Sequence, residues 1–184
     1  MQYVLLAPGP SMSQAVADSV RGQKVGVLTS AYPLAPWADF LAATDAGWWR
    51  NYPDAKLFAG AKYSAAKVGD EVTQIATSHV GTSSSSGVLA LEVAKQRGAT
   101  RILLLGFDHK GTHYFGPYKN GLRNTPDRRR KEHAEQFAQW GRVNKDIEVL
   151  NCTEGSALKC FPMARLDDCL AELAAPGIGP NGIF

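Results

Sequence analysis

Two turns of small residues, each between an apolar run and a helical run, constrain the fold of this chain more than any other feature. The first turn, Ala7-Pro8-Gly9-Pro10-Ser11, directly follows the apolar run 3–6. The second, 81–87, contains four consecutive serines and directly precedes the helical run 88–97. Turns of this kind present backbone N–H groups at a helix N-terminus, where the helix dipole favours an anion. Together they predict a site for a nucleotide or another phosphorylated ligand.

Strand and helix patterns alternate along the chain. Short apolar runs bounded by Gly, Pro or polar residues predict strands at 3–7, 24–29, 39–43, 101–106 and 147–150, with weaker candidates at 55–59 and 71–76. Helices are expected at 11–20 with Ser11 as N-cap, in a turn after Asp45, and at 87–97, 127–144 and 164–174. This alternation predicts an α/β fold with a mainly parallel sheet and helices on both faces. Such sheets bind ligands at the carboxyl ends of their strands, near the topological switch point.

Length and composition limit the remaining possibilities. The chain has 184 residues and a net charge of +3, which permits an anionic ligand without favouring nucleic acid. We expect one domain at 1–175 and a loose tail at 176–184. The three cysteines, Cys152, Cys160 and Cys169, lack paired spacing, so no disulfide framework or zinc site is indicated. No apolar run approaches the ~20 residues of a membrane helix and no signal peptide precedes the first strand, so we expect a cytoplasmic protein.

The two turns differ in how strongly they indicate a ligand. Gly9, Pro10 and Ser11 can offer N–H groups and a hydroxyl to a phosphate or ribose, but an ordinary tight turn explains them equally well. They match neither the dinucleotide fingerprint nor the P-loop. In the second turn, Ser85 and Ser86 can contact a base, ribose or phosphate, and Gly87 allows close approach. A flexible linker is the alternative, and the adjoining helix disfavours it.

A polar, Gly-rich loop follows the strongest strand pattern and spans 108–126. Asp108 is a candidate ligand for a ribose or a metal, and His113 is a candidate general base near neutral pH. The loop also contains side chains suited to a phosphate or sugar: Tyr114, Tyr118, Asn120 and Arg123. A solvated loop is the alternative for each of these residues. His109 and His113 have helical spacing for a metal, but Gly111 makes a helix there unfavourable, so we expect no histidine metal site.

Four consecutive cations, Arg128 to Lys131, open the predicted helix at 127–144. This end of a helix is electrostatically poor for cations, which suggests an anionic partner such as a diphosphate or a nucleic-acid backbone. A solvated helix face is the alternative. Trp48 and Trp49 could stack on a base or sugar, although core packing is expected for at least one of them.

Several of these segments resemble known enzymes. The run 4–12 resembles the opening strand and Gly-Pro-Ser turn of bacterial lipooligosaccharide sialyltransferases. Ser85 to Val88 and Arg101 to Asp108 resemble their Ser-Gly-Val segment and their strand ending in Gly-hydrophobic-Asp. The same blocks are similar to motility accessory factors and hydroxymethylpterin diphosphokinases. Small phage-encoded proteins of unknown role are similar over most of the chain.

The resemblance implies a Rossmann-like fold and a site for a CMP moiety at Gly9, Ser11, Ser86 and Gly87. Two departures from the sialyltransferases are evident. This chain has Pro8 where those enzymes have Asn, which removes an amide contact. It also has only the loop at 108–126 where they have a larger lid.

We therefore expect a glycosyltransferase-like enzyme that binds a nucleotide-sugar donor and transfers the sugar to an acceptor hydroxyl. His113 would take the acceptor proton, Asp108 would contact the ribose or a metal, and the loop would stabilise the leaving phosphate. One alternative is a diphosphokinase-like transferase that uses ATP and Mg²⁺. Another is an accessory protein that binds a nucleotide or nucleic acid without catalysis.

Overall fold

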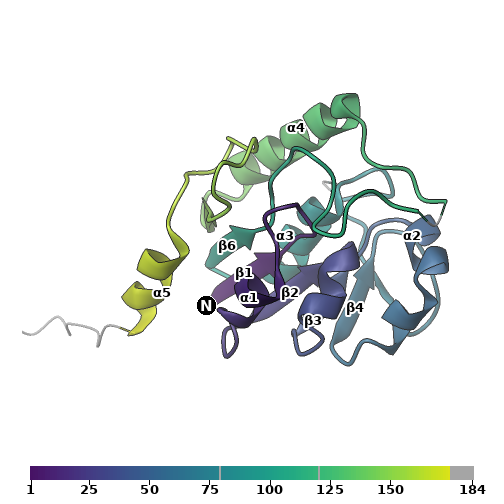
Figure 1. The fold of residues 1–184 in the computed structure, drawn as a ribbon, viewed down its shortest axis with the longest axis horizontal. Coiled ribbons are helices and arrows are strands. Elements are labelled where there is room, and N and C mark those ends of the chain that lie inside the picture. The colour runs from purple at the N-terminus through teal and green to yellow at the C-terminus, as the bar shows by residue number, and fades with distance from the viewer. Residues whose placement is uncertain (79, 120, 175–184) are drawn as a thin grey trace, which may run out of the picture.

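A parallel sheet of seven strands forms the centre of the computed structural model, which describes residues 1–78, 80–119 and 121–174 (Figure 1). Its order is β5-β4-β3-β2-β1-β6-β7, and every neighbouring pair is parallel. The strands are β1 (Gln2–Leu6), β2 (Val25–Leu28), β3 (Phe40–Ala42), β4 (Ala61–Ser64), β5 (Thr73–Gln74), β6 (Arg101–Leu105) and β7 (Glu148–Asn151). The predicted α/β class is confirmed, and the architecture is Rossmann-like.

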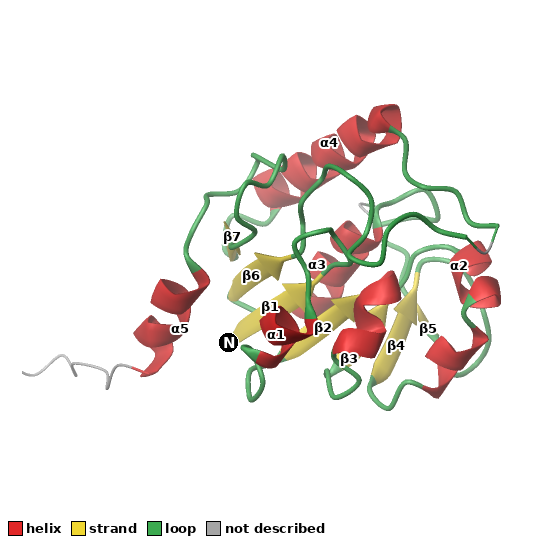
Figure 2. Ribbon diagram, in the orientation of Figure 1, coloured by secondary structure: helices red, strands yellow, loops and turns green. Residues whose placement is uncertain are grey.

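Helices connect most of the consecutive strands, and α5 follows the last strand (Figure 2). They are α1 (Gln14–Asp18), α2 (Ala46–Asn51), α3 (Ser86–Gln96), α4 (Asp127–Val143) and α5 (Leu166–Ala174), with 3₁₀ helices η1 (Thr29–Leu34) and η2 (Pro53–Leu57). In the described residues, no helix is long and apolar enough to cross a membrane.

Both faces of the sheet are covered because alternate side chains of each central strand enter different cores. In β1, Tyr3 and Leu5 belong to the core that includes residues of α3 and α4, whereas Val4 and Leu6 belong to the core that includes residues of α1, α2 and α5. Strand β6 follows the same alternation. A strand buried on both faces is apolar throughout, which is why these two strands have the strongest apolar patterns in the sequence.

The switch point of the sheet lies between β1 and β6. After β1 the chain builds β2 to β5 on one side, and it then returns to pair β6 with the other edge of β1. The carboxyl ends of β1 and β6 therefore lie side by side while their connections leave in opposite directions. Ligands of open α/β sheets bind at this position.

Two expected elements differ from the structure. Ser13, not Ser11, is the N-cap of α1, and its hydroxyl accepts from the Val16 N–H at 3.2 Å. The Ser11 hydroxyl instead donates to Asp108. The weak strand expected at 55–59 is wrong: Pro53 opens the 3₁₀ helix η2 there, and the strand follows at β4. The sequence pattern does not predict β4 because this strand is short and only partly buried.

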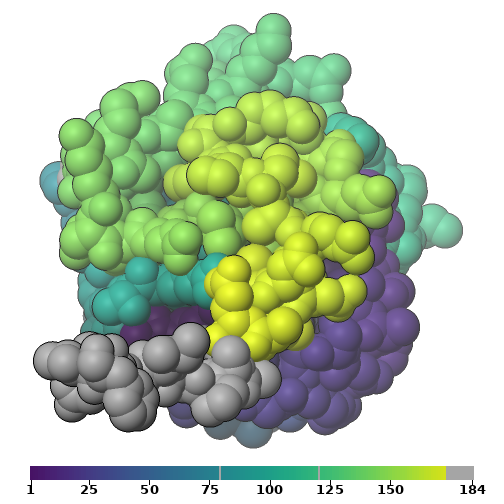
Figure 3. Space-filling model, turned by 90° about the vertical axis from the view of Figure 1, so that its left-hand side faces the viewer, coloured from purple at the N-terminus to yellow at the C-terminus, as the bar shows by residue number. Residues whose placement is uncertain are grey.

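Helix α5 covers the end of the sheet near β6 and β7. Cys169 is buried in the same core as β1 and β6, and Arg101 forms ion pairs with Glu148 and Glu172 at 2.8 Å. Figure 3 shows this C-terminal segment, in yellow, between the green α4 region and the purple N-terminal segment. The tail expected at 176–184 lies outside the described residues.

Candidate functional site

The turns after β1 and β6 bind each other at the switch point. The Gly9 N–H donates to the Gly106 carbonyl at 3.1 Å. The buried Asp108 carboxylate accepts from the Ser11 hydroxyl at 2.7 Å and from the Ser11 N–H at 3.3 Å. A Cβ on Gly9 would lie 2.0 Å from the Asp108 carboxylate, so the turn can approach this closely only with glycine.

A cavity of about 490 Å³ opens beside these turns. This volume is in the range of small-molecule sites, about 300–1,000 Å³. The cavity lies at the carboxyl ends of the strands because the residues that follow them form its floor. These residues are Ala7, Pro8 and Gly9 after β1, Leu28 and Thr29 at the end of β2, Thr44 and Asp45 after β3, and Gly106 and Phe107 after β6.

The serine segment 82–87 forms a wall of the cavity at the N-terminus of α3. Ser85 is the N-cap, and its hydroxyl accepts from the Gly87 N–H at 3.1 Å. The Ser86 hydroxyl accepts from the Thr44 N–H at 3.0 Å, which ties α3 to the end of β3. The expected helix start at this segment is confirmed. A Cβ on Gly87 would lie 2.4 Å from the ring of Phe137, so this glycine also lets α3 and α4 pack closely.

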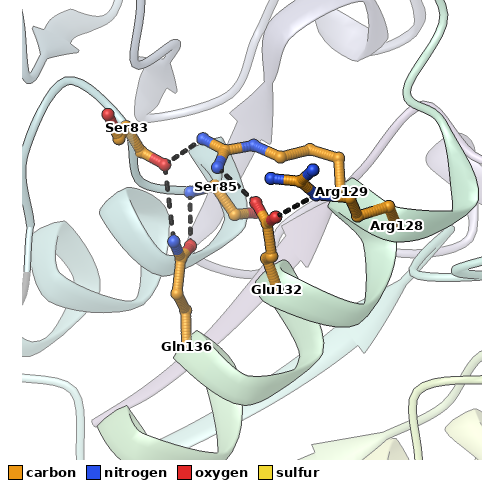
Figure 4. A network of polar contacts seen from close by, with 6 residues as sticks. All are labelled: Ser83, Ser85, Arg128, Arg129, Glu132 and Gln136. Carbon is orange, nitrogen blue, oxygen red and sulfur yellow. Dashed lines mark hydrogen bonds and ion pairs between the residues drawn. The ribbon is translucent and has the colours of Figure 1, made fainter.

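Helix α4 holds the serine segment from the other side (Figure 4). Arg129 donates to the Ser83 carbonyl, and it binds the Glu132 carboxylate at 2.7 Å. The Gln136 amide accepts from the Ser85 N–H at 2.9 Å and donates to the Ser83 carbonyl at 3.4 Å. The segment is therefore a built part of the fold, and the flexible-linker alternative is not supported.

The loop after β6 lines the cavity and is anchored to the first half of the chain. The Tyr114 N–H donates to the Pro8 carbonyl and its hydroxyl donates to the Ser30 carbonyl, both at 3.1 Å. The Ser30 hydroxyl contacts the Tyr118 hydroxyl at 3.1 Å and accepts from the Trp48 indole at 3.2 Å. One buried serine thus joins the loop to α2.

His113 lies in an aromatic cluster on this loop and lines the cavity. Its ring stacks on Phe115, with centroids 4.9 Å apart, and meets Tyr118 at 4.3 Å. Burial lowers the pKa of His113 below its ordinary value. Its Nδ1 is buried with no hydrogen-bond partner among the described residues. The imidazole is therefore neutral at neutral pH and able to accept a proton.

The α4 side of the cavity is basic. His109 adopts a left-handed backbone conformation, φ +57°, and packs against the ring of Phe137 at 5.8 Å. Such a conformation costs about 1–2 kcal/mol outside glycine. Arg130 donates to the Gly111 carbonyl at 2.5 Å. Burial, with the nearby Arg129 and His109, lowers the pKa of His133 to about 4.

The structure brings most of the candidate residues together, with exceptions. The candidates that line the cavity are Gly9, Ser85, Ser86, Gly87, His113, Tyr118 and Arg123. Those that do not line it are Pro10, Ser11, Asp108 and Tyr114. Asn120 lies outside the described residues. Asp108 instead holds the turn of Ser11, and the ribose or metal role expected for it stays a prediction.

The sequence alone does not single out His133 or Arg129 as site residues, although both line the cavity. Arg129, His133 and Phe137 are four residues apart and so share one face of α4. That spacing is a signal in the sequence. It becomes informative only once the side of α4 that faces the sheet is known.

The basic run of α4 is largely paired within the fold. Arg128 and Arg129 both bind Glu132, at 3.1 and 2.7 Å, and Arg130 pairs with Asp127. These carboxylates offset the unfavourable placement of cations at a helix N-terminus. A nucleic-acid partner is therefore not required to explain the run.

Among the described residues, no group of three or more His, Cys, Asp or Glu side chains is arranged to hold a metal ion. Comparisons with protein-family models, curated proteins and solved structures found no match to this chain. The resemblance to sialyltransferase-like enzymes therefore stays a prediction.

We predict that Ser11→Ala and Asp108→Ala each lower the free energy of unfolding by about 1–3 kcal/mol, because each removes a hydrogen bond to a carboxylate. Chemical denaturation measures this loss. In the double variant the losses should be non-additive by at least ~0.5 kcal/mol. Ser83→Ala, which leaves the Ser83 carbonyl in place, is the control. Full additivity of the two losses would contradict a direct contact between Ser11 and Asp108.

Proposed function

We propose that this protein is a glycosyltransferase-like enzyme that binds a nucleotide-sugar donor in the cavity at the switch point. The observation that supports this most strongly is the position of the cavity. It lies where β1 and β6 end, beside the N-terminus of α3, and the residues after both strands line it. The phosphates of nucleotides bind at helix N-termini of this kind. The nucleotides themselves bind at the switch points of open α/β sheets.

The composition of the cavity walls suits a donor with a phosphate and a sugar. Hydroxyls and backbone groups of Ser85 and Ser86 lie on one side, and Arg129 and Arg130 lie on the α4 side. The loop between β6 and α4 contributes Tyr118 and Arg123. Sites for small molecules combine an apolar lining with a few convergent polar groups, and this cavity contains both.

The transfer step needs a base and stabilisation of the leaving group. The acceptor hydroxyl oxygen forms a bond to the anomeric carbon of the sugar as the bond from that carbon to the phosphate oxygen breaks. The nucleotide leaves with the electron pair, and neutral His113 takes the acceptor proton. Arg123 and the basic residues of α4 stabilise the charge on the departing phosphate. The three cysteines carry free thiols, which supports the proposed cytoplasmic location, where thiols stay reduced.

The two alternatives have less support. A Mg²⁺-dependent diphosphokinase would use Asp108 as a metal ligand, but that carboxylate accepts two hydrogen bonds from Ser11 and does not line the cavity. A nucleic-acid accessory protein would use the run from Arg128 to Lys131, whose arginines are paired with Asp127 and Glu132.

A thermal-shift panel of CMP, UDP, GDP, ADP, ATP and CMP-sialic acid, with and without Mg²⁺, tests donor binding. At ~100 times its dissociation constant, a ligand that binds only the native state stabilises it by about 2.7 kcal/mol. We predict a metal-independent rise in Tm with one nucleotide class. A shift with ATP that requires Mg²⁺ would favour the diphosphokinase instead. No shift with any compound would contradict nucleotide binding.

We predict that His113→Ala lowers turnover by about 10²–10⁴-fold, the usual contribution of a general base. The thermal shift with the nucleotide should persist, because His113 is assigned to the acceptor side of the reaction. The assay is release of nucleotide from the donor that the panel identifies, with water as acceptor. Full turnover in this variant would remove His113 from the mechanism.

A further inference from the structure

Four basic side chains from two segments gather at the α4 side of the cavity: His109, Arg129, Arg130 and His133. His109 comes from the loop after β6, and the other three come from the first two turns of α4. Phe137, one turn beyond His133, is buried beneath them. We call these four residues the basic corner.

We propose that the basic corner is a subsite for a phosphate dianion, such as the terminal phosphate of a nucleoside diphosphate or a phosphate monoester. This inference rests on the proposed function and deepens it: the nucleotide released by the transfer ends in a phosphate monoester, whereas the phosphates of the intact donor are diesters. Arg129 and Arg130 are partly offset by Glu132 and Asp127. His109 and His133 can each add a positive charge when protonated, which matches the second charge of a dianion rather than the single charge of a phosphodiester. A terminal phosphate has three free oxygens and up to two charges.

The geometry of the corner supports a bound anion. Arg129 and Arg130 each place one guanidinium edge on a carboxylate and another N–H on a loop carbonyl, of Ser83 and Gly111 respectively. These contacts hold both guanidinium groups at the cavity wall. The left-handed conformation of His109 places its ring against Phe137 on the same wall. The cations are thus positioned before a ligand arrives, so their ordering adds little cost to binding.

Binding at this corner should take up protons. Burial lowers the pKa values of His109 and His133, the latter to about 4, so both rings are neutral in the free protein at neutral pH. A dianion favours the protonated form of each ring and raises its pKa. As the pH falls toward the pKa of His133 in the free protein, the protonated rings add positive charge to the subsite, so the affinity for the anion increases.

Charged and titratable groups on α4 and on the loop after β6 act on the pKa of His133. On its own helix, Arg129 opposes protonation of His133 and Glu132 favours it. From the loop after β6, His109 opposes it. His109 is in turn opposed by Arg130. A bound dianion would favour protonation of both histidines, because its negative charge offsets the charges of Arg129 and Arg130 together.

Sulfate is the probe for this subsite, since it stays a dianion between pH 5.0 and 7.5 whereas a phosphate changes its own charge. Isothermal titration calorimetry with sodium sulfate, at constant ionic strength, gives the affinity at each pH. Repeating it in buffers of different ionisation heat gives the number of protons taken up. We expect roughly tenfold tighter binding at pH 5.0 than at 7.5 with net proton uptake.

The matched variants separate the corner from general charge. His133→Gln should abolish most of the pH dependence, and Arg129→Gln should weaken sulfate binding at both pH values. Arg128→Gln is the control: this neighbour also binds Glu132 but does not line the cavity. It should leave sulfate affinity within about twofold. Thermal unfolding at both pH values checks that each variant is folded.

The subsite is overturned if sulfate fails to bind, if its affinity is the same at both pH values, or if His133→Gln binds it as the unmodified protein does. These failures differ from failure of the proposed function. A nucleotide shift in the thermal panel without sulfate binding would retain the donor site and overturn only the basic corner. Sulfate binding of the expected kind without any nucleotide shift would retain the corner and overturn nucleotide binding.

Discussion

The close approach of the turns after β1 and β6 is the contact on which the rest of the site depends. Gly9 has no room for a side chain against Asp108, and Gly106, with φ +73°, lies as tightly against the Ala7 carbonyl. The Asp108 carboxylate then holds Ser11 by two hydrogen bonds. These contacts hold the two turns together, and the residues that follow β1 and β6 line the cavity beside them. The contact at the switch point thus fixes the floor of the cavity.

Arginines of α4 hold two other walls of the cavity in place by donating hydrogen bonds to backbone carbonyls. Arg129 holds the serine segment by the Ser83 carbonyl, and Arg130 holds the loop by the Gly111 carbonyl. A run of cations that looks misplaced at a helix N-terminus therefore anchors two walls at once. Its carboxylate partners, Asp127 and Glu132, lie in the same turns and offset the charge. The arginines that anchor these walls are therefore also members of the basic corner.

Features that depend on local chain chemistry could be predicted from the sequence, and those that depend on tertiary contacts could not. The buried strands β1 and β6 are continuous apolar runs, and Ser85 caps α3 as its position suggested. Ser11 was expected to cap α1, but its hydroxyl donates to Asp108, 97 residues away, and no local pattern reveals that partner. His133 faces the cavity only because of how α4 packs on the sheet. Most of the fold was therefore accessible from sequence, whereas the division between structural and cavity-lining residues was not.

Mapping the nucleotide site on the protein tests the central claim most directly. A titration followed by ¹H–¹⁵N NMR, with the nucleotide that gives the largest thermal shift, reports on individual backbone amides. We predict saturable shifts at Gly9, Gly106 and the serine segment 82–87, which surround the cavity. Shifts confined to another surface, such as the one around Cys152 and Arg165, would contradict a ligand site at the switch point.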